Sequence, residues 1–167
     1  MDREQLQMIS VGLGELGVSR DPKTCQVAHG LGSCVGVCAY DPVAKVGALL
    51  HAMLPEQNGQ GPSHAAKYVD SGIMHMLDVL EGQGAQRRRL VVHLAGGAHM
   101  LIAPGFKNTL NIGARNADMA RAVLQREGLR IAGEDTGGHC GRTVRLHVDD
   151  GKVTVRSVGQ GEQVLSR

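Results

Sequence analysis

The sequence predicts an α+β fold, in which mixed but largely antiparallel β-sheets pack against two main helices. Two observations support this prediction. Short runs of β-forming residues cluster in the first third of the chain and again near its end, and only two segments between them show helical spacing of apolar residues. Strands and helices do not alternate strictly, as they would in a dinucleotide-binding fold.

The first third of the chain is predicted to consist of strands. Runs of β-forming residues occur there, separated by short polar or glycine-rich segments. We expect strands at residues 8–13, 25–28, 34–40 and 46–53.

The first helix is predicted at residues 64–80, with Ser63 as its N-cap and Gly82 as its stop. Its apolar residues recur at the spacing of one helix face. They are Ala65, Val69, Ile73, Leu77 and Leu80.

A buried strand is predicted at residues 90–95, followed by a second helix at residues 114–127 that ends at Gly128. The chain then returns to strands. Residues 144–148 and 153–158, joined by an Asp-Asp-Gly turn, are typical of a hairpin.

Length and composition exclude several classes of protein. The chain has 167 residues, and we expect residues 1–167 to form a single domain. A net charge of +2, with two Tyr, one Phe and no Trp, argues against nucleic-acid binding. No run approaches the ~20 apolar residues of a membrane span, and the N-terminus lacks a secretory pattern. We therefore expect a cytoplasmic protein without membrane insertion, whose four cysteines are thiols.

The segment from Cys34 to His51 predicts a β-hairpin that carries a candidate catalytic pair. Asp and Pro at residues 41 and 42 suit the type I turn of a four-residue loop, at residues 41–44. The register that follows from this loop places Cys34 directly opposite His51. Opposed side chains have Cβ atoms about 4.5–5.5 Å apart, so the thiol and the imidazole would lie within hydrogen-bonding reach.

Side-chain alternation supports this arrangement, because a slip by one residue would move His51 onto the opposite, apolar face of the hairpin. The residues on that face are Val35, Val37, Ala39, Val46, Ala48 and Leu50.

A thiol beside an imidazole can act as the activated pair of a cysteine hydrolase. The imidazole accepts the thiol proton, and the thiolate then attacks an acyl carbon. The small residues before Cys34 would let the backbone N–H groups of Gly32 and Ser33 approach a developing oxyanion.

Other interpretations of these residues stay open. A cysteine in a strand, taken alone, is more often a small buried residue, and we interpret Cys25, Cys38 and Cys140 in this structural way. Zinc is disfavoured, because Cys34 and Cys38 would lie about 13 Å apart in a strand, too far for two Zn–S bonds of ~2.3 Å. We expect no metal and no cofactor.

Five motifs follow one another over most of the chain, from Val11 to Gln163. They are GLGSCVGV at residues 30–37, HAMLP at 51–55, AGGA at 95–98, NIGARN at 111–116 and EDTGG at 134–138. Together they resemble the chemoreceptor glutamine deamidases, the CheD family. The family's catalytic Cys and His fall on Cys34 and His51.

The resemblance implies a layered α/β sandwich, similar to that of toxin-type cysteine deamidases. It implies a protein-glutamine glutaminase that converts selected glutamines to glutamates on the cytoplasmic helices of methyl-accepting chemotaxis proteins. Hydrolysis of receptor methyl esters and regulation by a CheC-type phosphatase are further implications.

One position departs from the family pattern. The family's third catalytic residue is a Thr six positions before the Cys, and this position is Ala28 here. Either His29, a backbone carbonyl or another Thr takes its place, or activity is weakened. In the second case the protein acts mainly as a binding module for the phosphatase and receptors.

The remaining motifs supply candidate contacts for a receptor or a phosphatase. Gly96 and Gly97 could admit a substrate backbone, or could form a tight turn. Arg115 and Asn116 could hold a partner, or could cap and solvate the second helix. Residues 134–138 could form a phosphate or metal loop, but the two acidic residues disfavour phosphate, and a structural turn is the preferred interpretation.

Overall fold

The computed structural model describes residues 5–59, 62–100 and 111–165, which form two five-stranded sheets and two α-helices. The outer sheet has the order β1 (Gln7–Ser10), β3 (Thr24–Leu31), β8 (Arg142–His147), β9 (Val153–Ser157) and β10 (Glu162–Val164). The middle sheet has the order β2 (Glu15–Ser19), β5 (Val46–Ala52), β4 (Val35–Asp41), β6 (Val91–Gly96) and β7 (Ile131–Thr136).

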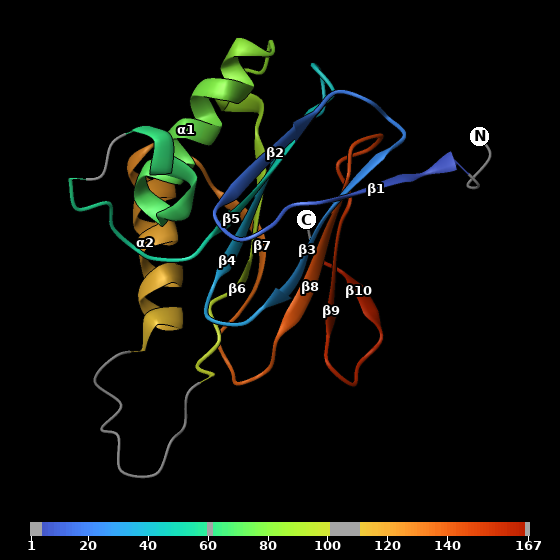
Figure 1. The fold of residues 1–167 in the computed structure, drawn as a ribbon. Helices are drawn as coiled ribbons and strands as arrows, with labels where there is room; N and C mark the ends of the chain where they lie inside the picture. Colours follow the sequence, from blue (N-terminus) through green and yellow to red (C-terminus); the bar gives the residue numbers. More distant parts are fainter. Residues whose placement is uncertain (1–4, 60–61, 101–110, 166–167) are drawn as a thin grey trace, which may run out of the picture.

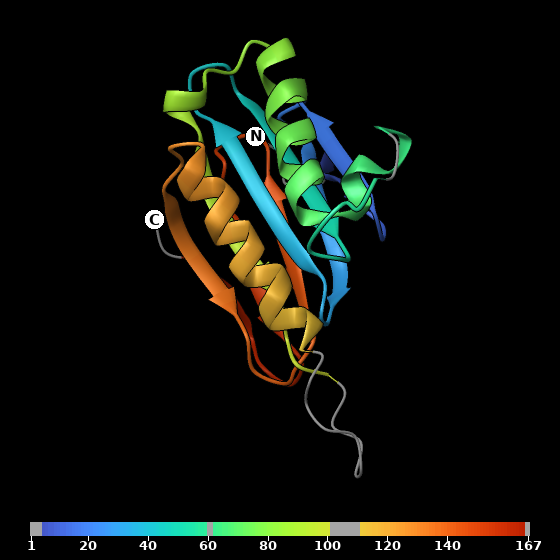
Figure 2. The same ribbon diagram turned by 90° about the vertical axis from the view of Figure 1, so that its left-hand side faces the viewer.

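The elements stack in three layers, with the middle sheet between the outer sheet and the helices (Figure 1). Helices α1 (Val69–Gly82) and α2 (Ile112–Arg126) lie side by side on one face of the middle sheet (Figure 2). The pairs β1–β3 and β6–β7 are parallel, and the other strand pairs are antiparallel. The predicted α+β class, with mixed sheets and two main helices, is confirmed.

The two faces of the β4–β5 hairpin take the sides that its side-chain alternation predicts. Its apolar face, which includes Val37 and Leu50, packs under the helices. The opposite face packs against the outer sheet, where Cys38 and Leu49 meet Leu146. Cys34 packs against this second cluster, so its side chain lies between the two sheets.

The predicted register of this hairpin is wrong by two residues. Gly36, not Cys34, lies opposite His51, and Asp41 pairs with Val46 as the last pair of the ladder. The loop has the expected four residues but occupies residues 42–45, because Asp41 stays in β4 and its carboxylate accepts hydrogen bonds from two loop N–H groups. Lys45 closes the loop with a φ of 54°. A shift of two residues preserves the face of every side chain, which is why the faces were predicted correctly.

Helix boundaries and weak strands account for the other differences. A 3₁₀ helix, η2 (Pro62–Lys67), precedes α1, whose N-cap is Tyr68 and not Ser63. Strands β2, β7 and β10 were not predicted, because their sequences are rich in Gly, Glu and other residues with weak β preference. None of the helices formed by the described residues is both long and apolar enough to cross a lipid bilayer.

Candidate active site

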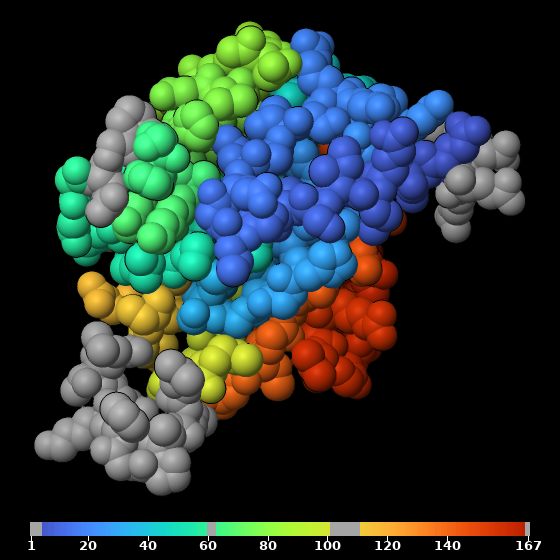
Figure 3. All heavy atoms as spheres, viewed as in Figure 1, coloured from blue at the N-terminus to red at the C-terminus, as the bar shows by residue number. Residues whose placement is uncertain are grey.

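Cys34 lies in a short bend, residues 32–34, between β3 and β4, which we call the Cys34 loop. The chain that continues from β6 holds this loop from one side. Gly97 N–H donates to the Cys34 carbonyl at 2.8 Å, and Ala98 N–H donates to the Gly32 carbonyl at 2.8 Å. Figure 3 shows the two segments, light blue and yellow, side by side at the surface.

Two glycines make this close approach possible. Gly96 has a φ of +103°, and a Cβ atom there would overlap the carbonyl oxygen of Cys34. Gly97 has a φ of +65°, and a Cβ atom there would lie 2.8 Å from the carbonyl oxygen of Gly113, in the first turn of α2. The backbone that these glycines admit here belongs to the chain itself. Contact of Gly96 and Gly97 with a substrate or partner stays a prediction.

The thiol of Cys34 is partly buried. This burial raises the pKa of Cys34, while a hydrogen bond from its own backbone N–H acts in the opposite direction. The sulfur is consequently a neutral thiol near neutral pH, and it needs a base before it can act as a nucleophile.

His51 is buried, with 2% of its surface exposed, and its ring has a defined orientation. Nδ1 lies 3.0 Å from the carbonyl oxygen of Val11, in the segment that connects β1 to β2. A carbonyl oxygen only accepts hydrogen bonds, so Nδ1 carries a proton, and in the neutral imidazole Nε2 then carries the lone pair. Within the described part of the chain, Nε2 is buried without a hydrogen-bond partner.

Cys34 and His51 therefore share one face of the middle sheet, but they are diagonal and not directly opposed. Diagonal neighbours on an antiparallel pair have Cα atoms about 7–8 Å apart, which is within reach of longer side chains. The described residues contain no hydrogen bond between the thiol and Nε2. In free enzymes such bonds are often long and tighten only when substrate binds.

Asn116 has a different place from the surface contact that the sequence suggested. Its side chain, on α2, is completely buried, and Nδ2 donates to the Ser33 carbonyl at 2.9 Å and to the Met53 carbonyl at 3.0 Å. The signal that could have located it is its position on the buried stripe of α2, where a polar residue indicates an internal hydrogen bond. Its neighbour Arg115 is exposed, without a side-chain hydrogen bond to any other described residue.

The backbone N–H groups of Gly32 and Ser33 face no acceptor among the described residues. Their role as hydrogen-bond donors to an oxyanion stays a prediction.

A pocket of about 350 Å³ is lined by Gly97, whose N–H bonds to the Cys34 carbonyl, but by no residue of the Cys34 loop. Other residues that line it are His99, Asn111, Asp118, Arg121, Thr136 and His139. Arg121 is not free within it, because its guanidinium pairs with Glu134 at 2.6 Å and with Asp118 at 3.1 Å. Residues 134–136 form the end of β7, and residues 136–138 line this pocket. The turn interpreted from the sequence is limited to the residues after Thr136, where Gly137 and Gly138 have positive φ values.

Comparison with known proteins gives the family. A family model described as CheD chemotactic sensory transduction matches residues 53–157. A protein of Symbiobacterium thermophilum, named probable chemoreceptor glutamine deamidase CheD, is 45% identical over 158 residues, which cover 93% of this chain and 96% of the relative. The chain belongs to the CheD family.

Two other relatives carry the CheD name. The chemoreceptor glutamine deamidase CheD of Thermotoga maritima is 42% identical over 154 residues, covering 92% of this chain and 94% of its own. A probable CheD of Thermococcus kodakarensis is 42% identical over 158 residues, covering 93% and 96%. Among solved structures, Neisseria meningitidis protein NMB0706 covers 83% of this chain and 66% of its own, at 13% identity and a TM-score of 0.48.

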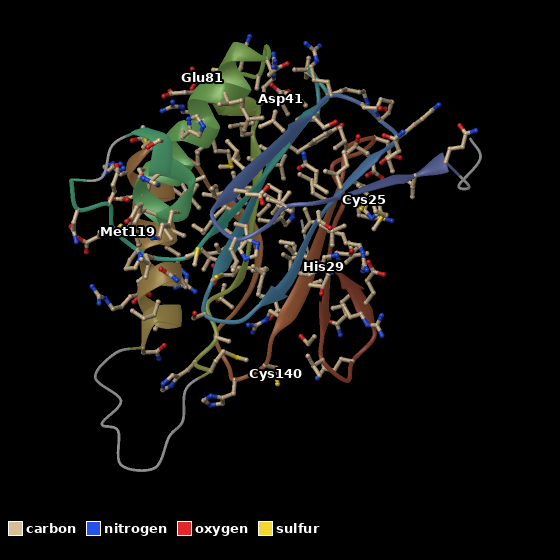
Figure 4. All side chains as sticks on the ribbon, in the orientation of Figure 1. Cys25, His29, Asp41, Glu81, Met119 and Cys140 are labelled. Atoms are coloured by element: carbon tan, nitrogen blue, oxygen red, sulfur yellow. The ribbon has the colours of Figure 1, made fainter. Side chains whose placement is uncertain are left out.

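The position at which the CheD resemblance implies a Thr is occupied by Ala28, which is fully buried between the two sheets. His29 lies beside it, exposed in a bulge of β3 (Figure 4), and the Nδ1 atom of His51 bonds to Val11 instead. The imidazole thus contacts a backbone carbonyl, one of the alternatives that the sequence left open, and the part of this carbonyl in catalysis stays a prediction. No side-chain signal could have identified Val11 in this role, because only its main chain takes part.

Proposed function

We propose that this CheD family member hydrolyses glutamine side-chain amides on chemoreceptors, with Cys34 as the nucleophile and His51 as the base. One observation carries the proposal. The bond from His51 Nδ1 to the Val11 carbonyl leaves a buried lone pair on Nε2, on the same sheet face as a partly exposed thiol that requires a base. The names of the relatives as glutamine deamidases support the choice of substrate.

In the first half of the reaction, the proton of the Cys34 thiol moves to His51 Nε2 and the sulfur attacks the amide carbon of glutamine. The oxyanion that forms can accept hydrogen bonds from the N–H groups of Gly32 and Ser33. The carbon–nitrogen bond then breaks, and Nε2 returns its proton to the departing ammonia.

In the second half, a water molecule loses a proton to Nε2 and attacks the thioester carbon. The carbon–sulfur bond breaks, Cys34 regains its proton, and the side chain leaves as glutamate. The products are glutamate on the receptor and ammonia. The same sequence of steps would hydrolyse a receptor methyl ester, with methanol as the leaving group, and we include this reaction in the proposal.

We further propose that residues 1–167 act as one deamidase domain, that the substrates are cytoplasmic helices of chemoreceptors, and that a CheC-type phosphatase binds the protein. The added negative charge would shift the signalling equilibrium of a receptor.

The test is mass spectrometry of a receptor cytoplasmic fragment after incubation with the protein. We expect particular glutamines to gain the mass difference between an amide and an acid, and Cys34→Ala to abolish this change. His51→Ala should lower the rate by about 10²–10⁴-fold, the usual contribution of a general base. Cys140→Ala, which removes an exposed thiol, is the matched control and should react like the wild type.

Modification that persists in Cys34→Ala would contradict the assignment of the nucleophile. An unmodified receptor, together with tight binding of the phosphatase by the wild type, would favour the binding-module alternative, which Ala28 supports.

A further inference from the structure

We infer that Asn116 is a positioning residue, whose side-chain amide holds the Cys34 loop against the end of the strand that carries His51. This inference rests on the proposed function, because it concerns how the two proposed catalytic side chains keep their relative positions.

The hydrogen bonds of Asn116 join two segments that are distant in sequence. Nδ2 has two hydrogens, and it donates one to the Ser33 carbonyl at 2.9 Å and the other to the Met53 carbonyl at 3.0 Å. Ser33 immediately precedes Cys34, and Met53 follows His51 by two residues. One amide group on α2 thus connects the segments of both proposed catalytic residues.

Helix α2 is well placed to fix this amide. Its first turn packs closely against the segment that follows β6, because a Cβ atom at Gly113 would overlap the Ala98 carbonyl oxygen. The N–H of Ala98 in turn bonds to Gly32 in the Cys34 loop. The side chain of Asn111 caps the helix by accepting from Ala114 N–H. Helix α2, the segment that follows β6 and the Cys34 loop are therefore connected to one another around Asn116.

Packing alone does not explain an asparagine here. The side chain has no exposed surface, and its Oδ1 is buried without a hydrogen-bond partner among the described residues. An unpaired buried oxygen costs free energy that an apolar side chain would avoid. This cost is offset because the two N–H donors of Asn116 satisfy two carbonyls that no apolar residue could satisfy.

The test uses the full-length protein in a Cys140→Ala background, so that alkylation by iodoacetamide reports on Cys34. We compare Asn116→Leu, which fills the space without a donor, Asn116→Ser, which keeps one donor, and Gln125→Ala, an exposed amide on the same helix. The readouts are kcat and KM on a receptor fragment, and the rate of alkylation as a function of pH.

Loss of the two hydrogen bonds from Asn116 should move the Cys34 thiol relative to His51 Nε2. A displacement of about 1 Å can lower a rate by about 10²-fold. We therefore expect Asn116→Leu to lower kcat by about 10–100-fold with a smaller change in KM. The pH dependence of Cys34 alkylation in this variant should resemble that of His51→Ala. Asn116→Ser should be intermediate, and Gln125→Ala should match the background protein.

Asn116→Leu with a lower melting temperature but an unchanged kcat and alkylation profile would overturn the inference, because Asn116 would then only stabilise the fold. If neither variant folds, hydrogen exchange in the wild type decides. Both Nδ2 protons of Asn116 should exchange far more slowly than the side-chain amide protons of Gln125, and equally fast exchange would overturn the inference.

The two hypotheses fail in different ways. If the wild type leaves receptor glutamines unmodified while alkylation still depends on His51 and Asn116, the proposed substrate is wrong and the positioning role stands. If Cys34→Ala abolishes deamidation while Asn116→Leu behaves like the background protein, the proposed function stands and the positioning role is wrong.

Discussion

At the scale of single residues, the surroundings of Cys34 are built largely from backbone groups. The Val11 carbonyl orients His51, and the N–H of Gly97 holds the Cys34 carbonyl. Such contacts need backbones to approach each other closely, so they depend on the absence of side chains at a few positions. Gly96 is the glycine at which a Cβ atom would overlap the Cys34 carbonyl oxygen.

Gly96→Ala should destabilise the protein and impair catalysis. The new methyl group would overlap the Cys34 carbonyl, and alanine at a φ of +103° is strained in addition. We expect a loss of about 2 kcal/mol or more in the free energy of unfolding, measured by urea denaturation, and a lower kcat, since Cys34 itself must move.

Gly82→Ala is the matched control for this substitution. Gly82 is the last residue of α1, and no atom lies within 4 Å of a Cβ atom placed there. It should leave activity unchanged and raise stability by up to about 1 kcal/mol. A Gly96→Ala protein as stable and active as this control would contradict the account of the Cys34 loop.

At the scale of elements, the β4–β5 hairpin is anchored at the end away from Cys34 by Asp41, which Figure 4 labels near the end of α1. Its carboxylate, with no exposed surface, accepts hydrogen bonds from Arg89, from Gln86 N–H and from two loop N–H groups. Burial opposes ionisation, but these hydrogen bonds outweigh it and lower the pKa of Asp41 to about 2.

The stability of the protein should therefore fall in acid. Because the folded pKa of Asp41, about 2, lies below its unfolded value of about 3.9, the ionised carboxylate stabilises the fold above about pH 4. This contribution is lost as the pH falls through about 2. Asp41→Asn should lower the free energy of unfolding by about 2–4 kcal/mol at neutral pH. In this variant the free energy of unfolding should fall less steeply between about pH 4 and 2 than in the wild type. Chemical denaturation at each pH measures both effects.

Asp78→Asn, which changes an exposed carboxylate on α1, serves as the control and should keep the wild-type pH profile. An Asp41→Asn protein with the same acid decline as the wild type would show that other carboxylates cause it.

At the scale of the whole molecule, the two apolar clusters share the middle sheet. One lies between this sheet and the helices, and the other lies between the two sheets. The orientation of the His51 ring depends on both clusters. His51 is on β5 of the middle sheet, while its hydrogen-bond partner Val11 lies in the connection from β1 of the outer sheet to β2 of the middle sheet. We therefore expect the layers to unfold together.

Leu77 belongs to the cluster between the helices and the middle sheet, and Leu146 belongs to the cluster between the two sheets. Replacing either residue with Ala should lower the free energy of unfolding by about 2–5 kcal/mol. Each variant should still show one calorimetric transition, at a lower temperature than the wild type. The reason is that unfolding of either apolar cluster also unfolds the middle sheet, which both clusters share. Val158→Ala, at a residue 76% exposed, should leave the transition almost unchanged. Two separate transitions in either core variant would contradict this cooperativity.

Several features of the fold and site could be predicted from local sequence. The alternation of Val35, Val37 and Ala39 with smaller or polar residues located both faces of the hairpin, and the spacing of Val69, Ile73 and Leu77 located α1. Strands such as β7, Ile131–Thr136, could not be predicted, because pairing with β6 rather than their own residues makes them strands.

The sequence by itself determined the fold class, the face of each side chain on the hairpin, and the choice of Cys34 and His51 as candidates, because these depend on period and residue type. Only the tertiary structure decided the hairpin register, the Val11 carbonyl as partner of His51, and the burial of Asn116. Each of these depends on groups that meet across long stretches of chain, such as Asp41 with Arg89 or Met53 with Asn116, and local patterns carry no information about such meetings.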